Sequence, residues 1–175
     1  STADSAKVVD SSDGDGLKLL VMQPIVVWCH FCAASKKNPK AFDIQIAESN
    51  YKAQWNLTDY GNEWIMNPRS VDEVGCIHTC QGLEVDYVGV IIGDDLMVRD
   101  GNVITNPKAR AKTDKSISGY KKLLKTNPEA ANKKADGIIR NTYRTLMTRG
   151  MKGCYIFCTD PETQAYFQDR LRARS

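Results

Sequence analysis

Cys76-Ile-His-Thr-Cys-Gln-Gly-Leu-Glu84 runs directly into Val85-Asp-Tyr-Val-Gly-Val-Ile-Ile92. The second stretch is a nearly continuous apolar run, which is typical of a strand buried on both faces of a parallel sheet. The first stretch is polar, and its Gly82 would let backbone amides approach a phosphate closely. Because the short apolar run Val74–His78 leads into these polar residues, we expect them at the carboxyl end of a strand, where α/β sheets bind ligands.

Other strands are predicted on both sides of this stretch. Apolar runs or alternating patterns predict strands at Leu17–Val27, Phe42–Ile46 and Cys154–Cys158. Two hairpins are also predicted, one from Tyr51–Leu57 and Glu63–Met66, and one from Leu96–Arg99 and Asn102–Thr105. We expect the second hairpin to be an insertion at the edge of the sheet.

Two helices are predicted from matching start signals. Asn127-Pro-Glu129 and Asp160-Pro-Glu162 each supply a capping side chain, a proline in the first turn and a carboxylate near the helix amino terminus. The helices should run from Pro128 to about Thr148 and from Pro161 to about Ala173. The first should turn one apolar stripe to the core: Ala131, Ala135, Ile138, Ile139, Thr142 and Leu146. Strand, helix, strand and helix in this order predict an α/β fold.

Composition bounds the rest of the prediction. A chain of 175 residues with 42% hydrophobic residues predicts one globular domain, which we expect over residues 17–175 after a loose, polar arm at residues 1–16. No stretch is long and apolar enough to predict a membrane span. Six cysteines are too few for a disulfide scaffold, which favours reduced thiols and a cytoplasmic location. The chain starts at Ser1 without Met, so we expect a longer parent chain.

A second polar segment joins the first predicted helix to the last predicted strand. In Asn141–Gly150 the helix ends against a glycine, and Arg149 is expected at its carboxyl end. An arginine there has two interpretations. It could bind a ligand, or it could satisfy the last carbonyl groups of the helix.

The net charge of +3 indicates no particular partner, but basic residues are concentrated in one region. Between Arg99 and Lys134 there are ten Lys or Arg residues against three acidic ones, and much of this segment belongs to a basic insertion at about residues 94–127. Such a patch could bind nucleic-acid phosphates without reading sequence, and it could also be a solvated surface. The candidate phosphate-binding side chains are Lys112, Lys115, Lys121 and Lys122.

The two polar segments together resemble motifs V and VI of superfamily 1 helicases. His78, Gln81, Gly82, Leu83 and Glu84 match motif V, whose family pattern is approximately Thr-x-His-x-x-(Lys/Gln)-Gly-Leu-Glu. Thr148 and Arg149 match the end of motif VI. The sequence patterns QGLE-x-DYVGV and N-x-YR-x-L-x-TRG-x-KG are similar to those of the Schlafen-group-3-type DNA/RNA helicases, a family also described as a domain of unknown function. The likeness covers about Lys36 to Leu171.

The resemblance implies a fold and a function. The fold would be the second, C-terminal RecA-like domain of a helicase: a parallel sheet flanked by helices in three layers, as in P-loop NTPases, with β-hairpin insertions. ATP would lie between this domain and a preceding RecA-like domain. Arg149 would be the arginine finger and the catalytic residue, joined at the ATP site by Gln81, Gly82 and Glu84. His78 and Thr79 would contact the backbone of DNA or RNA, and the expected substrate is a single strand.

The same resemblance implies what a partner domain would supply. The chain contains no G-x-x-x-x-G-K-[ST] phosphate-binding loop, so the preceding domain would hold most of the ATP and the Mg²⁺. We expect this chain alone to bind ATP weakly and not to hydrolyse it. No metal-binding residues are assigned to it.

Two alternatives stay open. The chain could be a nucleic-acid-binding or regulatory module that kept the fold without ATPase activity. It could also be a zinc module, because two cysteine pairs with neighbouring histidines offer enough soft ligands for a tetrahedral site: Cys29, His30, Cys32, Cys76, His78 and Cys80.

One departure from the helicase pattern concerns Tyr143, which lies six residues before Arg149, one position further than the aromatic residue of the family. Base stacking by Tyr143 is left open. Trp55 and Trp64 could stack on bases or pack in the core.

Overall fold

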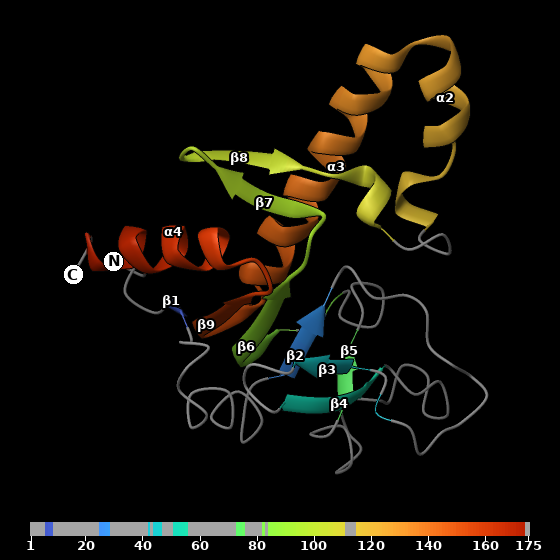
Figure 1. Cartoon of the computed structure of the whole chain (residues 1–175). Coiled ribbons are helices and arrows are strands. Elements are labelled where there is room, and N and C mark those ends of the chain that lie inside the picture. The colour runs from blue at the N-terminus through green and yellow to red at the C-terminus, as the bar shows by residue number, and fades with distance from the viewer. Residues whose placement is uncertain are drawn as a thin grey trace.

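The computed structural model describes residues 6–8, 25–28, 42, 44–46, 51–55, 73–75, 82, 84–110 and 115–173. These residues form a mixed α/β fold (Figure 1). The strands are β1 (Ala6–Val8), β2 (Ile25–Trp28), β3 (Ile44–Ile46), β4 (Tyr51–Trp55), β5 (Glu73–Gly75), β6 (Val85–Ile92), β7 (Leu96–Arg99), β8 (Asn102–Thr105) and β9 (Gly150–Cys158). The helices are α2 (Tyr120–Thr126), α3 (Pro128–Met147) and α4 (Pro161–Arg172), with short 3₁₀ turns η4 (Pro107–Ala109) and η5 (Lys115–Ile117).

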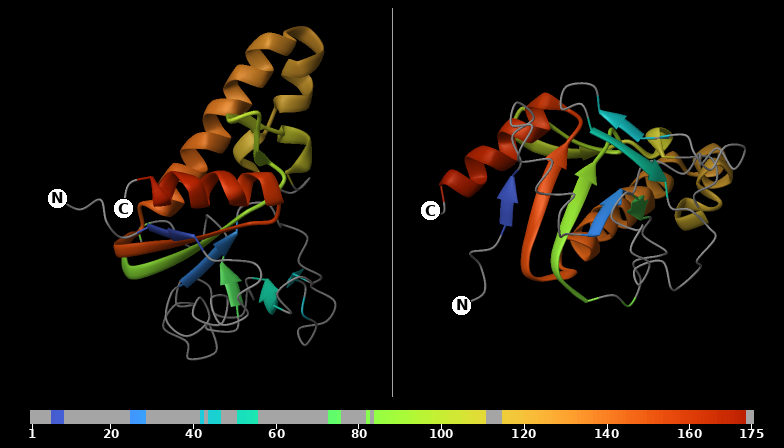
Figure 2. Two further views of the ribbon diagram at one scale, coloured as in Figure 1. Left: turned by 60° about the vertical axis from the view of Figure 1, so that its left-hand side comes forward. Right: turned by 90° about the horizontal axis from the view of Figure 1, so that it is seen from below.

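The main sheet has the strand order β1-β9-β6-β2-β5-β4-β3 among the described residues. Its neighbouring strands are parallel except for β3, which pairs antiparallel with β4. The predicted parallel sheet is therefore present, with one antiparallel strand at its edge. Figure 2 shows β9, β6 and β2 side by side in the sheet.

Strand β6 has the bounds that its apolar run predicted. Val88, Val90 and Ile92 point to one face of the sheet and join the core cluster under the helices. Ile91 points to the opposite face and is also buried. Strand β9 begins at Gly150, four residues before the predicted start. The reason is pairing: residues 150–153 carry little apolar pattern, but they lie against the first residues of β6.

Helices α3 and α4 begin where the sequence predicted. The Asn127 side chain accepts a hydrogen bond from the amide of Ala130 (3.0 Å), and Asp160 accepts one from the amide of Thr163 (2.9 Å). On α3, Ile139 and Leu146 are buried in the core cluster, each worth roughly 1.5–3 kcal/mol. Ile138 is only half-buried, and Tyr143 takes its place in the buried stripe.

The predicted hairpin β7–β8 is present, but it is not at the edge of the main sheet. Asp100 (φ 51°) and Gly101 (φ 73°) form its turn, and the two strands make a separate sheet. The amide of Val98 donates to Thr163 Oγ1 of α4 (2.9 Å) instead of to a strand of the main sheet. The hairpin lies against α3 and α4, on the helical side of the molecule (Figures 1 and 2).

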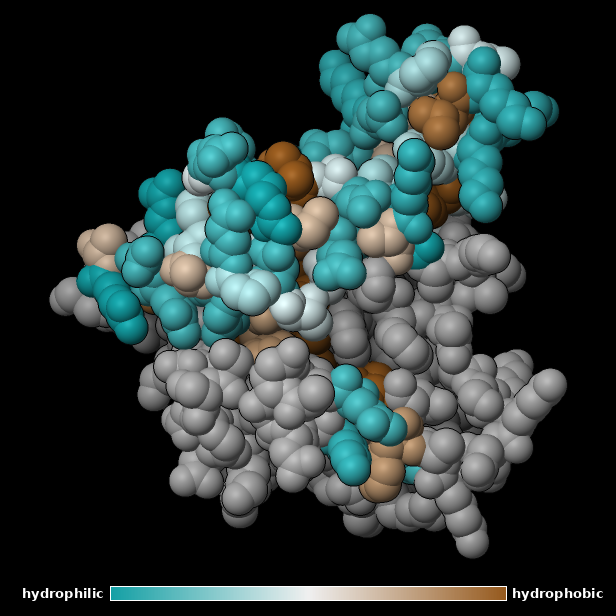
Figure 3. All heavy atoms as spheres, in the orientation of Figure 1, coloured by the Kyte–Doolittle hydropathy of each residue, from teal (hydrophilic) through white to brown (hydrophobic). Residues whose placement is uncertain are grey.

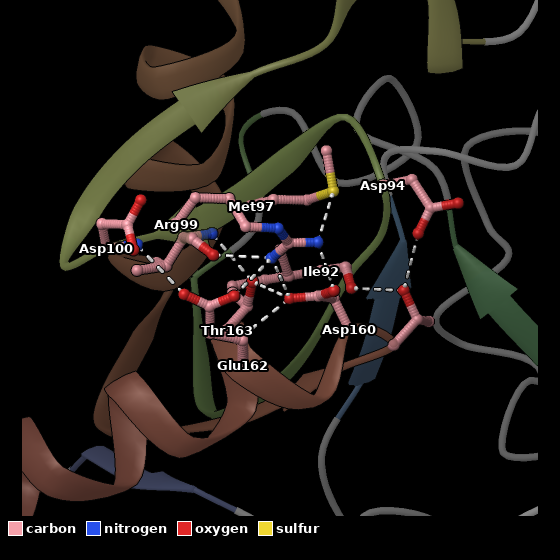
Figure 4. A network of polar contacts seen from close by, with 10 residues as sticks. Ile92, Asp94, Met97, Arg99, Asp100, Asp160, Glu162 and Thr163 are labelled. Carbon is pink, nitrogen blue, oxygen red and sulfur yellow. Dashed lines mark hydrogen bonds and ion pairs between the residues drawn. The ribbon is translucent and has the colours of Figure 1, made fainter.

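An ion pair holds this hairpin to the start of α4. The Arg99 guanidinium donates two hydrogen bonds of 2.7 Å to the two carboxylate oxygens of Asp160, and Glu162 accepts one from the amide of Asp100 (3.1 Å; Figure 4). The Arg99 guanidinium, together with Thr163, holds the pKa of the Asp160 carboxyl well below its usual range. One carboxylate thus both caps α4 and fixes β7.

The resemblance implies helices on both faces of the sheet, in three layers. Among the described residues, α3 and α4 contribute Ile139, Tyr143, Leu146 and Phe167 to one cluster with the same face of β6 and β9. The described helices therefore cover one face, and a three-layer arrangement is not observed in this part of the chain.

The structure describes only part of the segments predicted before β6. Part of the arm expected at residues 1–16 forms β1, since residues 6–8 pair with Cys154, Tyr155 and Ile156 of β9. The remaining arm residues, the strand Glu63–Met66 and most of Leu17–Val27 lie outside the described residues. The boundaries of the domain and of its insertion stay a prediction. Of the helices that the structure describes, none has the length and apolarity to cross a membrane.

Candidate nucleotide-binding edge

The two helicase-like segments meet at one edge of the main sheet. Strands β6 and β9 are parallel neighbours, and Val85 pairs with Gly150 at their first residues. The amide of Val85 donates a hydrogen bond to the carbonyl oxygen of Arg149 (3.2 Å). Glu84 and Arg149, separated by 65 positions in the sequence, therefore lie at the starts of adjacent strands.

This edge is the amino end of β6 and β9. The sequence predicts these polar residues at the carboxyl end of a strand, the usual ligand-binding position. The expectation fails for Glu84 because β6 begins at the very next residue. The carboxyl end of α3 reaches the same edge, since Arg149 follows its last turn.

The motif V residues that the structure describes are accessible. Gly82 is exposed, has φ +78°, and a Cβ added there would meet no atom within 4 Å. A positive φ favours glycine, and the open space would admit a ligand close to the backbone. The Glu84 side chain is exposed. Both observations fit a group that approaches this turn from solvent.

Arg149 is half-buried at the end of α3. Its amide donates to the carbonyl of Leu146 (3.2 Å), so the backbone is held by the last helical turn. Within the described part of the chain, its guanidinium has no hydrogen-bond or ion-pair partner. The alternative in which it satisfies the terminal carbonyls of α3 finds no bond there.

Gly150 fixes the direction in which the chain leaves Arg149. A Cβ at this position would lie 2.0 Å from the carbonyl oxygen of Gly153 and 3.1 Å from a methyl group of Val88. The pairing also shifts here, because Val85 faces Gly150 while Tyr87 faces Gly153. A bulge in β9 therefore follows Arg149 directly, and only glycine fits at its first residue.

The structure does not describe several of the other predicted site residues. His78, Thr79, Gln81 and Lys112 lie outside the described residues, and so do the six candidate zinc ligands Cys29, His30, Cys32, Cys76, His78 and Cys80. Among the residues that are described, no group of three or more His, Cys, Asp or Glu could hold a metal ion. The side chains of Trp55 and Trp64 are likewise not described.

Tyr143 does not face a ligand. Its side chain is 2% exposed, and its hydroxyl donates to Asp95 Oδ1 (2.5 Å) and accepts from the amide of Gly93 (3.2 Å). Asp95 also accepts a hydrogen bond from Arg110 Nε (3.0 Å), and both charged side chains are fully buried. This network was missed by the sequence analysis, since no local pattern relates Asp95 to Arg110 or Tyr143. Stacking of Tyr143 on a base is excluded by its burial.

The basic segment supplies a separate surface at the outer ends of α2 and α3. Tyr120 and Asn132 join the two helices through a hydrogen bond of 2.9 Å. We call the exposed lysines there the basic tip: Lys121, Lys122, Lys125, Lys133 and Lys134. Figure 3 shows hydrophilic side chains around this end of the molecule, at its upper right. Lys121 and Lys122 are thus exposed, and Lys115 begins η5.

Two cations of the same segment have structural partners instead. Arg99 pairs with Asp160, and Arg110 is buried against Asp95. The count of basic residues in the sequence therefore overstates the charge available to nucleic acid, because burial and pairing cannot be read from composition.

The described cysteines are not candidates for catalysis. Burial raises the pKa of the Cys154 thiol to about 12, and burial also raises that of Cys158. A reactive cysteine needs a thiolate near neutral pH, so both thiols behave as core residues.

Comparison with known proteins relates this arrangement to a family. The family model described as "Schlafen group 3, DNA/RNA helicase domain" matches residues 25–160. The chain is also 30% identical over 115 residues to "Uncharacterized protein YPL245W" from Saccharomyces cerevisiae, an alignment that covers 65% of this chain and 24% of the yeast protein. The chain thus spans about a quarter of the length of that relative. No solved structure matches it. The family match covers well over half of the residues, including β6, α3 and β9, and the chain therefore belongs to the Schlafen group 3 DNA/RNA helicase domain family.

Proposed function

We propose that this chain is the C-terminal, RecA-like motor domain of a superfamily 1 DNA/RNA helicase or translocase. It would form one wall of an ATP site, and a preceding RecA-like domain would supply the phosphate-binding loop and hold the Mg²⁺. The family match supports a helicase-like role in general. The observation that carries the finer proposal is the meeting of Glu84 and Arg149 at the starts of two hydrogen-bonded parallel strands.

Each residue of this edge has a chemical role in the proposal. Arg149 would stabilise negative charge that develops on the γ-phosphoryl oxygens, since its planar guanidinium can donate two parallel hydrogen bonds. Backbone amides near Gly82 would approach the γ-phosphate, with Gln81 beside them. The Glu84 carboxylate would accept a hydrogen bond from a ribose hydroxyl. ATP bound here would supply the phosphoryl group whose transfer to water drives movement.

Nucleic acid would bind elsewhere on the same domain. His78 and Thr79 would contact the backbone of a single strand of DNA or RNA, and the lysines of the basic segment, Lys112, Lys115, Lys121 and Lys122, would neutralise its phosphates. The accessible lysines of the basic tip support this second part of the proposal.

The test is ATP hydrolysis by the full-length protein that carries these residues. Arg149→Ala should lower kcat by roughly 10³–10⁵, and Arg149→Lys should recover little of it because lysine has no planar fork. Arg172→Ala, which changes an exposed arginine on α4, is the matched control and should leave kcat unchanged. Hydrolysis that survives Arg149→Ala would favour the alternative, a nucleic-acid-binding or regulatory module without ATPase activity.

A further inference from the structure

Helix α3 is attached to strand β6 at two separate points. At the carboxyl end of β6, the amide of Gly93 donates to the Tyr143 hydroxyl (3.2 Å). At the amino end, the amide of Val85 donates to the carbonyl of Arg149 (3.2 Å). Tyr143 and Arg149 are six residues apart, about 9 Å along a helix axis. The last turns of α3 are therefore held between two fixed contacts.

A buried ion pair holds the first of these contacts. The Tyr143 hydroxyl donates to Asp95, which is 0% exposed, and Asp95 in turn accepts from the Arg110 Nε. Arg110 Nη1 donates to Ser116 Oγ (2.8 Å), and the amide of Asn106 donates to the Asp95 carbonyl (2.9 Å). The tyrosine hydroxyl thus has a charged acceptor in a fixed position, on a turn that other hydrogen bonds hold in place.

This network is better suited to fixing the position of α3 than to adding net stability. Buried ion pairs contribute little net stability compared with well-packed apolar residues, because desolvation of the charges offsets their attraction. What directional hydrogen bonds add is a defined position for the groups they join. Here the group is a helix whose next two turns contain buried Leu146 and end at Arg149.

We infer that Tyr143, Asp95 and Arg110 are positioning residues for Arg149. They act through the final turns of α3 and do not touch ATP. The inference rests on the proposed function of Arg149, and it assigns to Tyr143 a role different from base stacking. Without the Tyr143 hydroxyl, α3 would keep its apolar contacts and lose one of its two attachments to β6.

The test uses Tyr143→Phe, which removes the hydroxyl and keeps the ring, in the full-length protein with Mg-ATP as the probe. We expect kcat to fall about tenfold with little change in KM, because the guanidinium would be misplaced mainly for the transition state. The matched control is Thr105→Val, which removes another side-chain hydrogen bond to α3, the 2.9 Å bond from Thr105 to Asp136. It should leave kcat unchanged.

A double variant separates positioning from a general loss of stability. In the Arg149→Ala background, Tyr143→Phe should cause no further decrease in kcat, since the residue it positions is absent. An equal decrease in both backgrounds, or no decrease in the wild-type background, would overturn the inference while leaving Arg149 as the arginine finger. If Arg149→Ala alone leaves kcat unchanged, the proposed function fails first.

Amide hydrogen exchange provides a readout that is independent of activity. Tyr143→Phe should accelerate exchange of the Val85 amide, which is bonded to Arg149, by about tenfold relative to the Val90 amide in the middle of β6. Equal acceleration at Val85 and Val90 would indicate a global loss of stability and would contradict the two-point attachment. Asp95→Asn and Arg110→Met are less informative, because each leaves a buried charge without its partner.

Discussion

The amide of Val85 and the carbonyl of Arg149 share a hydrogen bond of 3.2 Å at the starts of β6 and β9. This bond links residues from the two helicase-like segments, so the backbone before β6 and the end of α3 cannot move far apart without breaking it. Arg149 accepts this bond and Glu84 precedes its donor in the sequence, so both residues lie at the amino edge of the sheet.

Two glycine substitutions test the geometry around this bond through stability. Gly150→Ala should lower the free energy of unfolding by about 3 kcal/mol, because its Cβ would lie 2.0 Å from the Gly153 carbonyl oxygen. Gly137→Ala, within α3, meets no atom within 4 Å and should raise the free energy of unfolding by about 0.5–1 kcal/mol. Urea unfolding of both variants gives these values. Equal midpoints for the two variants would contradict the close approach at Gly150.

The ion pair between Arg99 and Asp160 predicts a dependence of stability on pH. The Asp160 pKa is depressed in the folded protein, so its stabilising contribution is present above the unfolded value of about 3.9 and is lost as the pH falls towards the folded value. Asp160→Asn should therefore lose less stability than the wild type between pH 5 and pH 2. Thermal unfolding across this range measures the difference. Asp169→Asn, at an exposed carboxylate, should follow the wild-type curve.

The basic tip predicts salt-dependent binding to single-stranded nucleic acid. Replacing Lys121, Lys122 and Lys125 by alanine should weaken binding to a dT oligonucleotide and reduce the slope of log K against log salt by about 2, since each phosphate contact on a single strand contributes about 0.7. Lys52→Ala, at an exposed position on β4, is the control and should leave the slope unchanged. Fluorescence anisotropy at several salt concentrations gives both slopes. An unchanged slope in the triple variant would remove the tip from the binding surface.

Local sequence signals predicted the elements at the centre of the fold. Strand β6 follows from its apolar run, the β7–β8 turn from Asp100-Gly101, and the starts of α3 and α4 from Asn127 and Asp160, because each depends on residues close together in the chain. The separate position of the hairpin was not predictable in this way. It depends on Thr163 and Asp160, which lie about sixty residues further along.

For the candidate site, too, local sequence patterns predicted some features and not those that depend on distant residues. The helicase-like pattern predicts a role for Glu84 and Arg149, but the sequence alone does not show that they lie at the amino ends of adjacent strands. The partners of Tyr143 were also missed, since Asp95 and Arg110 reach it only through the folded chain. Pairing of distant polar groups in the interior leaves no periodic signal in the sequence.

The contact that Tyr143 makes lies close to one end of α3. It is about 9 Å along the axis from Arg149 and about 22 Å from Pro128, next to the lysines of the basic tip. For a given tilt about Tyr143, the outer end would move between two and three times as far as Arg149. The position of Arg149 is therefore less sensitive to tilting of α3 than the position of the basic tip.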